Sequence, residues 1–147
     1  MLEINRATIG QLDALASLFN AYRVFYGRKP DLDGARAFLE ARLQHEESVI
    51  FLAELDSQPA GFTQLYPLFS SVNMSRIWLL NDLYVAESAR RHGVADALLD
   101  AARKHGEQTG ASGLMLETAE DNRPAQTLYE RKGWKREDGF YWYALEL

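Results

Sequence analysis

The chain contains no cysteine, and this absence excludes a whole range of chemistry. Without a thiol there is no disulfide, no cysteine nucleophile and no thiolate or iron–sulfur metal site. Histidine is scarce as well, and His45, His92 and His105 show neither an HExxH nor a His-x-His spacing. A zinc or non-haem iron site would therefore have to rely mostly on carboxylates, and we expect no metal.

The sequence also lacks a surplus of positive charge and a long apolar run. Sixteen lysines and arginines face 21 acidic residues, for a formal net charge of −5, whereas proteins that bind nucleic acid usually carry a basic surplus. No apolar run approaches the roughly 20 residues of a membrane helix, and Met1–Arg6 lacks the layout of a signal peptide. We therefore expect a cytoplasmic protein that binds neither nucleic acid nor membranes.

What is present is typical of one globular domain. The 147 residues are 47% hydrophobic and 25% charged, and a single core commonly serves a chain of this length. No repeat, low-complexity tract or flexible linker interrupts the chain. We predict one domain over residues 1–147.

The apolar pattern changes between helical and period-two spacing along the chain. The expected helices are one containing Leu12 to Tyr22, one capped by Asp31 or Asp33, Arg91–Glu107 and Pro124–Lys132. The expected strands are Leu2–Asn5, Ser48–Leu55, Ala60–Phe69, Ile77–Val85, Gly113–Thr118, Trp134–Arg136 and Phe140–Leu147. This order predicts an α/β fold with a mixed, mostly antiparallel sheet of about seven strands and helices on both faces.

The last two expected strands would form a closing hairpin. Its final segment, Phe140–Leu147, is rich in aromatic and apolar residues. An exposed sheet edge of this kind invites pairing with another chain. We therefore expect a homodimer formed partly through this segment.

A basic loop lies between the strand Ile77–Val85 and the helix that follows it. The loop and the helix start consist of Arg90, Arg91, His92, Gly93, Val94 and Ala95. The first N–H groups of a helix have no intrahelical partner and carry partial positive charge, so a diphosphate could bind there, with Gly93 allowing a close approach. Neither GxxxxGK[ST] nor GxGxxG occurs, which argues against nucleotide hydrolysis and Rossmann-type binding. Taken alone, the loop could equally be a solvated turn.

Two motifs together resemble the GCN5-related N-acetyltransferases (GNAT), which transfer an acetyl group from acetyl-CoA to an amine. Residues Arg90–Ala95 match the family's Arg/Gln-x-x-Gly-x-Gly/Ala, and Asn122–Trp134 is similar to its Asn-x-x-Ala-x-x-Leu-Tyr-x-x-x-Gly-Phe. Leu79–Val85 together with Asn122–Tyr129 is most similar to the diamine and spermidine N-acetyltransferase-like subgroup. The resemblance implies a V-shaped opening between the strands Ile77–Val85 and Gly113–Thr118.

The resemblance also implies how acetyl-CoA is held. Strand backbone would bind the pantetheine arm and the basic loop its diphosphate, with further contacts from the second motif. The implied cofactor-binding residues are Leu83, Tyr84, Val85, Arg90, Arg91, His92, Gly93, Val94, Ala95, Asn122 and Ala125. Tyr129 would lie near the sulfur as general acid, because the pKa of a tyrosine, about 10, is close to that of the leaving thiolate.

Direct attack on the thioester requires a neutral amine. An alkyl ammonium with a pKa of about 10.4 must first lose a proton. Asp82, within a strand, and Glu117, near the end of the next strand, are the candidate bases. Leu83 or Tyr84 would offer a backbone N–H to the developing oxyanion.

The acceptor is expected to be a small primary amine, either a polyamine or an amino-acid-like compound. Its candidate binding residues are Tyr22, Tyr26, Asn81 and Asp82. Acidic residues in the strand would suit a polyamine, whereas Arg23 or Arg28 would suit a carboxylate. A protein lysine as acceptor, and a non-catalytic acetyl-CoA-binding sensor or interaction domain, are the alternatives.

Three strand aromatics, Phe62, Tyr66 and Phe69, could also line an acceptor pocket. For Phe62 and Phe69 we favour a place in the hydrophobic core.

Overall fold

A five-stranded sheet organises the first of two units in the computed structural model, which describes residues 1–147. The first unit is Met1–Glu117 and the second is Thr118–Leu147. None of the helices combines the length and apolar character needed to cross a membrane.

The strands follow one another in the sheet in their sequence order. They are β1 (Leu2–Arg6), β2 (Val49–Leu55), β3 (Gln58–Ser70), β4 (Ser75–Val85) and β5 (Gly113–Met115). The first four are antiparallel, and β5 pairs with β4 in parallel. The helices of the first unit are α1 (Leu12–Phe25), α2 (Leu32–Gln44) and α3 (Val94–Gln108), and the second unit contains α4 (Arg123–Arg131).

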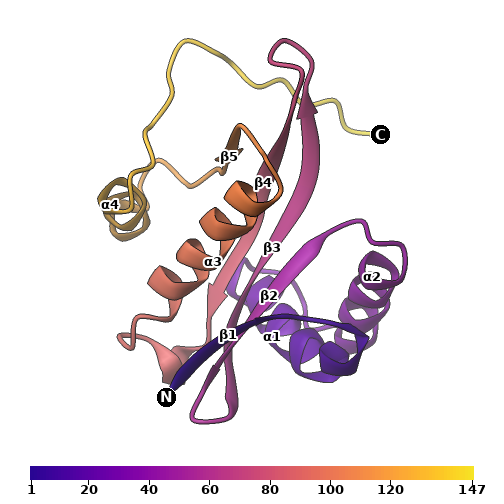
Figure 1. The fold of residues 1–147 in the computed structure, drawn as a ribbon. Helices are drawn as coiled ribbons and strands as arrows, with labels where there is room; N and C mark the ends of the chain where they lie inside the picture. The colour runs from indigo at the N-terminus through magenta and orange to yellow at the C-terminus, as the bar shows by residue number, and fades with distance from the viewer. The chain divides into compact units, whose positions relative to one another are not determined.

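Helices of the first unit cover both faces of the sheet, as predicted (Figure 1). Side chains of β2 alternate between the faces because of the period-two geometry of a strand. Ile50 and Leu52 pack with α1 and α2, whereas Phe51 and Ala53 belong to the cluster around α3. The sheet is therefore the middle layer of this unit.

The prediction of about seven strands is wrong, because the sheet has five. The expected strand Gly113–Thr118 ends at Met115, and neither Trp134–Arg136 nor Phe140–Leu147 forms a strand. Strand propensity measures how well a residue fits a pleated, half-buried surface. An apolar run therefore becomes a strand only where a neighbouring strand pairs with it.

The third helix also begins later than expected. The predicted helix Arg91–Glu107 starts at Val94, since Arg91 and Gly93 both have positive φ angles, +67° and +75°. The left-handed conformation is incompatible with a right-handed helix. Residues 90–93 therefore form a loop in front of α3.

Candidate active site

Strand β4 has a free edge over its second half. Its pairing with β5 begins at Ile77 and ends where Leu79 faces Met115, although β4 continues to Val85. Its other edge is paired with β3 as far as Val85. This partial pairing agrees with the expected opening between the two strands, and it leaves backbone groups that can pair with an extended ligand.

Backbone groups alternate between the two edges in this part of β4. The carbonyl of Asp82 accepts a hydrogen bond from a hydroxyl of β3 (2.8 Å), and the N–H of Ala86 donates to a carbonyl of β3 (2.8 Å). Alternate residues of an antiparallel ladder direct both groups to the same neighbour, so Tyr84 also faces β3. Leu83 and Val85 therefore direct N–H and C=O toward the free edge.

Asp82 lies at the centre of a buried hydrogen-bond network on the side of the sheet covered by α1 and α2. It is 3% exposed. Its Oδ2 accepts from Gln64 Nε2, while Oδ1 accepts from Asn81 Nδ2 (2.8 Å) and from the Tyr22 hydroxyl (3.3 Å). The amide oxygen of Gln64 accepts from the Ser48 hydroxyl (2.8 Å). Donors on both oxygens fix the orientation of this carboxylate.

The electrostatics of this network separate the roles of its two titratable groups. Burial raises the pKa of Asp82 above its ordinary value, and the hydrogen bonds from Gln64, Asn81 and Tyr22 lower it in part. Burial and then the charge of Asp82 raise the pKa of Tyr22 well above that of a free tyrosine. Asp82 is therefore a stronger proton acceptor than an exposed carboxylate, and the Tyr22 hydroxyl stays protonated.

The four predicted acceptor residues meet around this network. Tyr22 and Asn81 both donate hydrogen bonds to Asp82. The ring of Tyr22 also contacts the rings of Tyr26 and Tyr84, with centroids 5.1 Å and 6.0 Å apart. Tyr26 is well exposed. The C-terminal end of α1 thus places an aromatic surface beside the buried carboxylate.

The aromatic residues of β3 differ in their surroundings. Phe62 is buried in the core, as predicted, but Phe69 is 72% exposed, so its assignment to the core is wrong. Phe69 lies near the end of β3, where the guanidinium of Arg76 stacks on its ring at 4.6 Å. Stacking by a guanidinium covers one face of the ring without a core around it.

The start of α3 leaves its first N–H groups open. Gly93 occupies the N-cap position and makes no side-chain capping bond. Its φ of +75° strains any other residue, and nothing lies within 4 Å of the place where a Cβ would be. The first helical hydrogen bond is from Ala97 N–H to the Gly93 carbonyl (3.0 Å). Open N–H groups beneath unobstructed space fit the diphosphate of a cofactor.

Two side chains of the loop turn toward nearby backbone carbonyls. Arg90 Nε donates to the Val85 carbonyl (3.4 Å), and its guanidinium lies 5.7 Å from the centroid of the Phe25 ring. His92 Nδ1 lies 2.8 Å from the carbonyl oxygen of Arg90 and 3.3 Å from that of Ala89, where its N–H donates. His92 therefore stabilises the loop, and Arg90 lies at the end of β4's free edge.

The second motif forms a helix that is capped at both ends. Asn122 Oδ1 accepts from the Ala125 N–H (3.3 Å) at the start of α4. Gly133 has a φ of +94°, and the N–H of Trp134 donates to the Tyr129 carbonyl (3.0 Å). The Tyr129 and Trp134 rings, 6.3 Å apart, add the apolar contact of a Schellman motif.

Glu117 lies outside a strand, because β5 ends at Met115. It is exposed, in contrast to the buried Asp82. The structure gathers no group of three or more His, Asp or Glu side chains that could hold a metal ion.

Sequence reasoning missed three residues that shape the site. Gln64 and Ser48 support Asp82, and Gly61 allows Tyr84 to approach. A Cβ on Gly61 would lie 2.5 Å from the Tyr84 carbonyl oxygen and 3.2 Å from Val94 Cγ1. A polar Gln64 within the apolar strand β3 was the available signal, since a buried amide must find partners.

A strand with a free edge that leads to an uncapped helix start can accommodate an extended, anionic ligand, and comparison with known proteins identifies the family. The model of the acetyltransferase (GNAT) family matches residues 12–134. The chain is 48% identical, over 99% of its length and 98% of the relative's, to the uncharacterized N-acetyltransferase YhfO of Bacillus subtilis strain 168. A crystal structure of a probable acetyltransferase is 46% identical with a TM-score of 0.93, over 99% and 97% of the two chains.

The chain therefore belongs to the acetyltransferase (GNAT) family and is an acetyltransferase. Two structures of the same fold contain its expected cofactor. One is a predicted acetyltransferase from Clostridium acetobutylicum with acetyl-CoA, 18% identical over 99% and 96% of the chains with a TM-score of 0.78. The other is the aminoglycoside N-acetyltransferase AAC(6')-Iy with CoA, 22% identical over 100% and 96% with a TM-score of 0.83.

Proposed function

We propose that the protein, acting as one domain over residues 1–147, transfers the acetyl group of acetyl-CoA to a small primary amine. The acceptor is a polyamine, as in the diamine and spermidine subgroup, or an amino-acid-like compound. One observation carries the proposal: β4, the strand that carries the buried Asp82, has a free edge over its second half and leads to the open N-terminus of α3. Cofactor, acceptor and base can then meet along one strand.

Bound acetyl-CoA supplies the thioester carbonyl that the amine attacks. The N–H groups of the loop and the first turn of α3 hold its diphosphate, with charge from Arg90 and Arg91. Leu83 and Val85 offer backbone groups to its amides, because both face the free edge. Of the two expected oxyanion donors, Leu83 is favoured, since Tyr84 faces β3. A well-placed donor of this kind lowers the barrier by about 2.7 to 4 kcal/mol.

Asp82 accepts the proton of the amine through Tyr22. Asp82 is too buried to contact an acceptor itself, but Tyr22 donates a hydrogen bond to it. The Tyr22 oxygen takes a proton from the ammonium as the Tyr22 hydroxyl proton passes to Asp82 Oδ1. This concerted transfer avoids a free tyrosinate, which burial and the Asp82 charge disfavour.

Residues of the second unit keep, in this proposal, the roles that the family resemblance implies. Tyr129 protonates the leaving thiolate, and Asn122 and Ala125 contact the cofactor. The Nδ2 group of Asn122 is the donor for that contact, because its Oδ1 caps α4.

A panel of amines assayed with acetyl-CoA by release of free thiol tests the function. Turnover of at least one small amine is expected, and its absence with every amine would contradict the proposal. Tyr22→Phe and Asp82→Asn should each lower kcat about 100-fold, the scale of general base catalysis. As pH falls through the raised Asp82 pKa, the wild-type rate should decline, and Asp82→Asn should lose this decline. An unchanged profile in both variants would exclude the relay.

We further propose that the protein works in the cytoplasm as a homodimer. The apolar and aromatic segment Phe140–Leu147 is the basis for proposing a dimer. Light scattering at micromolar concentration should give twice the chain mass of 16.7 kDa, and a value equal to the chain mass would contradict it.

A further inference from the structure

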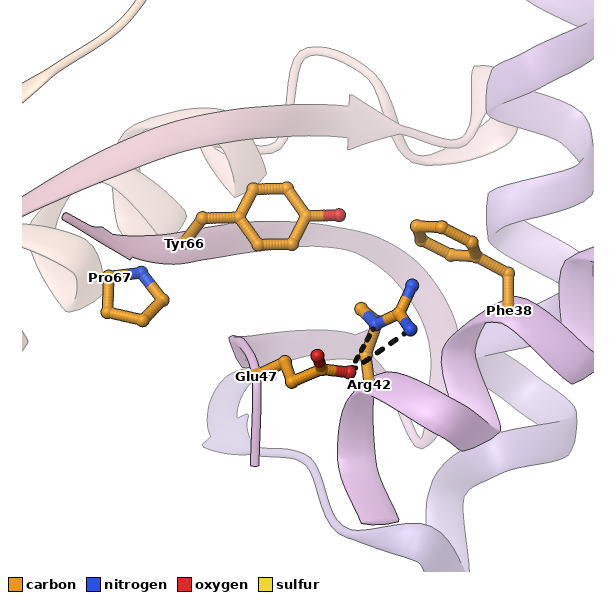
Figure 2. A pocket seen from close by; sticks show the side chains of 5 residues that line it. All are labelled: Phe38, Arg42, Glu47, Tyr66 and Pro67. Carbon is orange, nitrogen blue, oxygen red and sulfur yellow. Dashed lines mark hydrogen bonds and ion pairs between the residues drawn. The ribbon is translucent and has the colours of Figure 1, made fainter. Parts of the chain in front are cut away.

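A hollow opens on the first unit between α2, the turn that follows it and β3 (Figure 2). Its volume is about 540 Å³, and it is lined by Phe38, Arg42, Glu47, Tyr66 and Pro67. Aromatic and apolar surface forms its walls, and one ion pair lies at its side. No group proposed above for catalysis lines it.

Arg42 is held in one orientation within this hollow. Its Nε and Nη2 both lie 3.1 Å from Glu47 Oε1, and its guanidinium carbon lies 4.5 Å from the centroid of the Phe38 ring. These contacts engage one side of the guanidinium and one of its faces. The N–H groups of Nη1 have no hydrogen-bond partner in the protein, so a fixed donor remains for a ligand.

Tyr66 supplies a second donor. Its hydroxyl points toward the space between Phe38 and Arg42 (Figure 2). Burial, and then the negative charge of Asp82, raise the pKa of Tyr66 to about 12, so the hydroxyl keeps its proton. Two donors, one charged and one neutral, thus face the same hollow.

The hollow neighbours the buried carboxylate of the site. Tyr66 follows two residues after Gln64, which donates to Asp82, and two residues of a strand span about 6.7 Å. The charge of Asp82 acts on Tyr66. An acceptor whose amine lies at Tyr22 would need several bonds between its two ends for the other end to lie at Arg42.

We propose that this hollow binds a carboxylate of the acceptor, so that the substrate is an amine that carries a carboxylate at its far end. The inference rests on the proposed function and selects one of its two acceptor classes. A distal ammonium would find Glu47 occupied by two N–H groups of Arg42, with the Arg42 charge beside it. A carboxylate would instead find free N–H groups of Arg42 and the hydroxyl of Tyr66.

Three acceptors of equal chain length test the choice: 5-aminopentanoate, pentylamine and 1,5-diaminopentane. We expect kcat/KM to be at least tenfold higher for 5-aminopentanoate than for pentylamine, and no higher for the diamine than for pentylamine. In Arg42→Gln the ratio of kcat/KM for 5-aminopentanoate to kcat/KM for pentylamine should fall at least tenfold. A preference for the diamine, or an unchanged ratio in Arg42→Gln, would overturn the inference.

Two control variants separate this arginine from others. Arg103 forms a similar pair with Glu107, with Nε 3.1 Å from Oε1, on α3, and Arg103→Gln should keep the wild-type ratio. Arg23→Gln tests the arginine suggested by the sequence and should also keep it. A loss of the ratio in either variant, equal to that in Arg42→Gln, would contradict a specific role for Arg42.

A binding measurement separates failure of the inference from failure of the proposed function. The side-chain Nε–H resonance of Arg42, assigned by its loss in Arg42→Gln, is followed as 5-aminopentanoate is added to the CoA-loaded protein. A saturable shift, absent with pentylamine, supports the hollow even if no amine is acetylated. No shift overturns the inference even if other amines are turned over.

Discussion

Helices α3 and α4 begin in opposite ways, although both belong to the motifs that characterise the sequence. Asn122 caps α4 by accepting from the Ala125 N–H, whereas Gly93 at the start of α3 has no side chain to accept a hydrogen bond. The end of α4 is satisfied as well, through Gly133 and Trp134. The capping side chain satisfies an N–H group of α4 from within the protein, while the open start of α3 leaves its first N–H groups to water or a ligand.

The two motifs therefore differ in how far local structure explains them. In Asn122–Trp134, the asparagine, the glycine and the aromatic pair all have roles in the stability of α4 itself. In Arg90–Ala95, the glycine produces a left-handed turn that leaves N–H groups without partners. We expect substitutions in the two segments to separate ligand binding from folding.

The largest effect should come from giving α3 the kind of start that α4 has. Gly93→Asp adds a side chain that can cap the helix, but it also places negative charge where the diphosphate binds. Like charges in contact cost several kcal/mol, so acetyl-CoA affinity measured by calorimetry should fall about 100-fold or more.

Gly110→Asp is the matched control for this change. Gly110 has a similar φ of +71° and equally open surroundings, but it follows the C-terminal end of α3. Its substitution carries the same backbone strain and charge, and it should leave acetyl-CoA affinity within about twofold. Equal losses in both variants would show that the start of α3 is not the binding site.

Tyr129→Phe tests whether the capped segment also contains a catalytic group. The phenylalanine ring can keep the contact with Trp134, and the melting temperature is measured beside the kinetics. If Tyr129 is the general acid, kcat should fall about 100-fold with acetyl-CoA affinity retained. Tyr141→Phe, in the same unit, is the control. Equal and small effects of the two variants on kcat would leave only the structural explanation of the motif.

Asn122 allows capping and cofactor binding to be separated within one side chain. Asn122→Ala removes the cap and should cost about 1 kcal/mol of stability, measured by urea denaturation. Asn122→Asp keeps the oxygen that caps α4 but loses the amide N–H groups. It should therefore keep the stability and weaken acetyl-CoA binding severalfold. Unchanged affinity in Asn122→Asp would argue against a contact with the cofactor.

The sequence predicted those features that depend on residues close together in the chain. The order of the elements through α4 follows from local spacing, and so does the cap of α2, where Asp31 Oδ1 accepts from the Gly34 N–H (2.9 Å). The basic residues and glycine before α3 likewise indicated a turn at the start of a helix, although the helix begins at Val94 and not at Arg91. In each case, the signal lies within one or two turns of the backbone.

Features that depend on strand register could not be predicted in the same way. Ser48, Gln64 and Asp82 come from three strands or their flanking residues, and they meet because Gln64 pairs with Asp82 across β3 and β4. The register contains an irregularity directly after Gln64, which no local pattern indicated. The two donors of the hollow, Arg42 and Tyr66, are brought together by the same long-range packing. The hollow could therefore be recognised only in the structure.

The smallest effect concerns a polar atom that lacks a partner but lies where no ligand is expected. His105 Nε2 is buried without a hydrogen bond, and the His105 ring packs against Trp78 with centroids 4.7 Å apart. Burial, and then the charges of Arg6 and Arg76, lower the pKa of His105. The unfolded chain therefore takes up a proton more readily than the folded one, so stability is full above about pH 6.5 and declines as pH falls below it.

His105→Phe should remove this decline, because an apolar ring fills the same site without a titratable nitrogen. The measurement is the melting temperature between about pH 7.5 and 5.5, across the ordinary pKa of histidine. His45→Gln, at an exposed position, should keep the wild-type slope, and an equal slope in His105→Phe would assign the decline to other groups. If His105→Phe also leaves the affinity for acetyl-CoA unchanged, a polar atom without a hydrogen-bond partner does not by itself mark a ligand site. It does so only where open space adjoins it, as at Gly93.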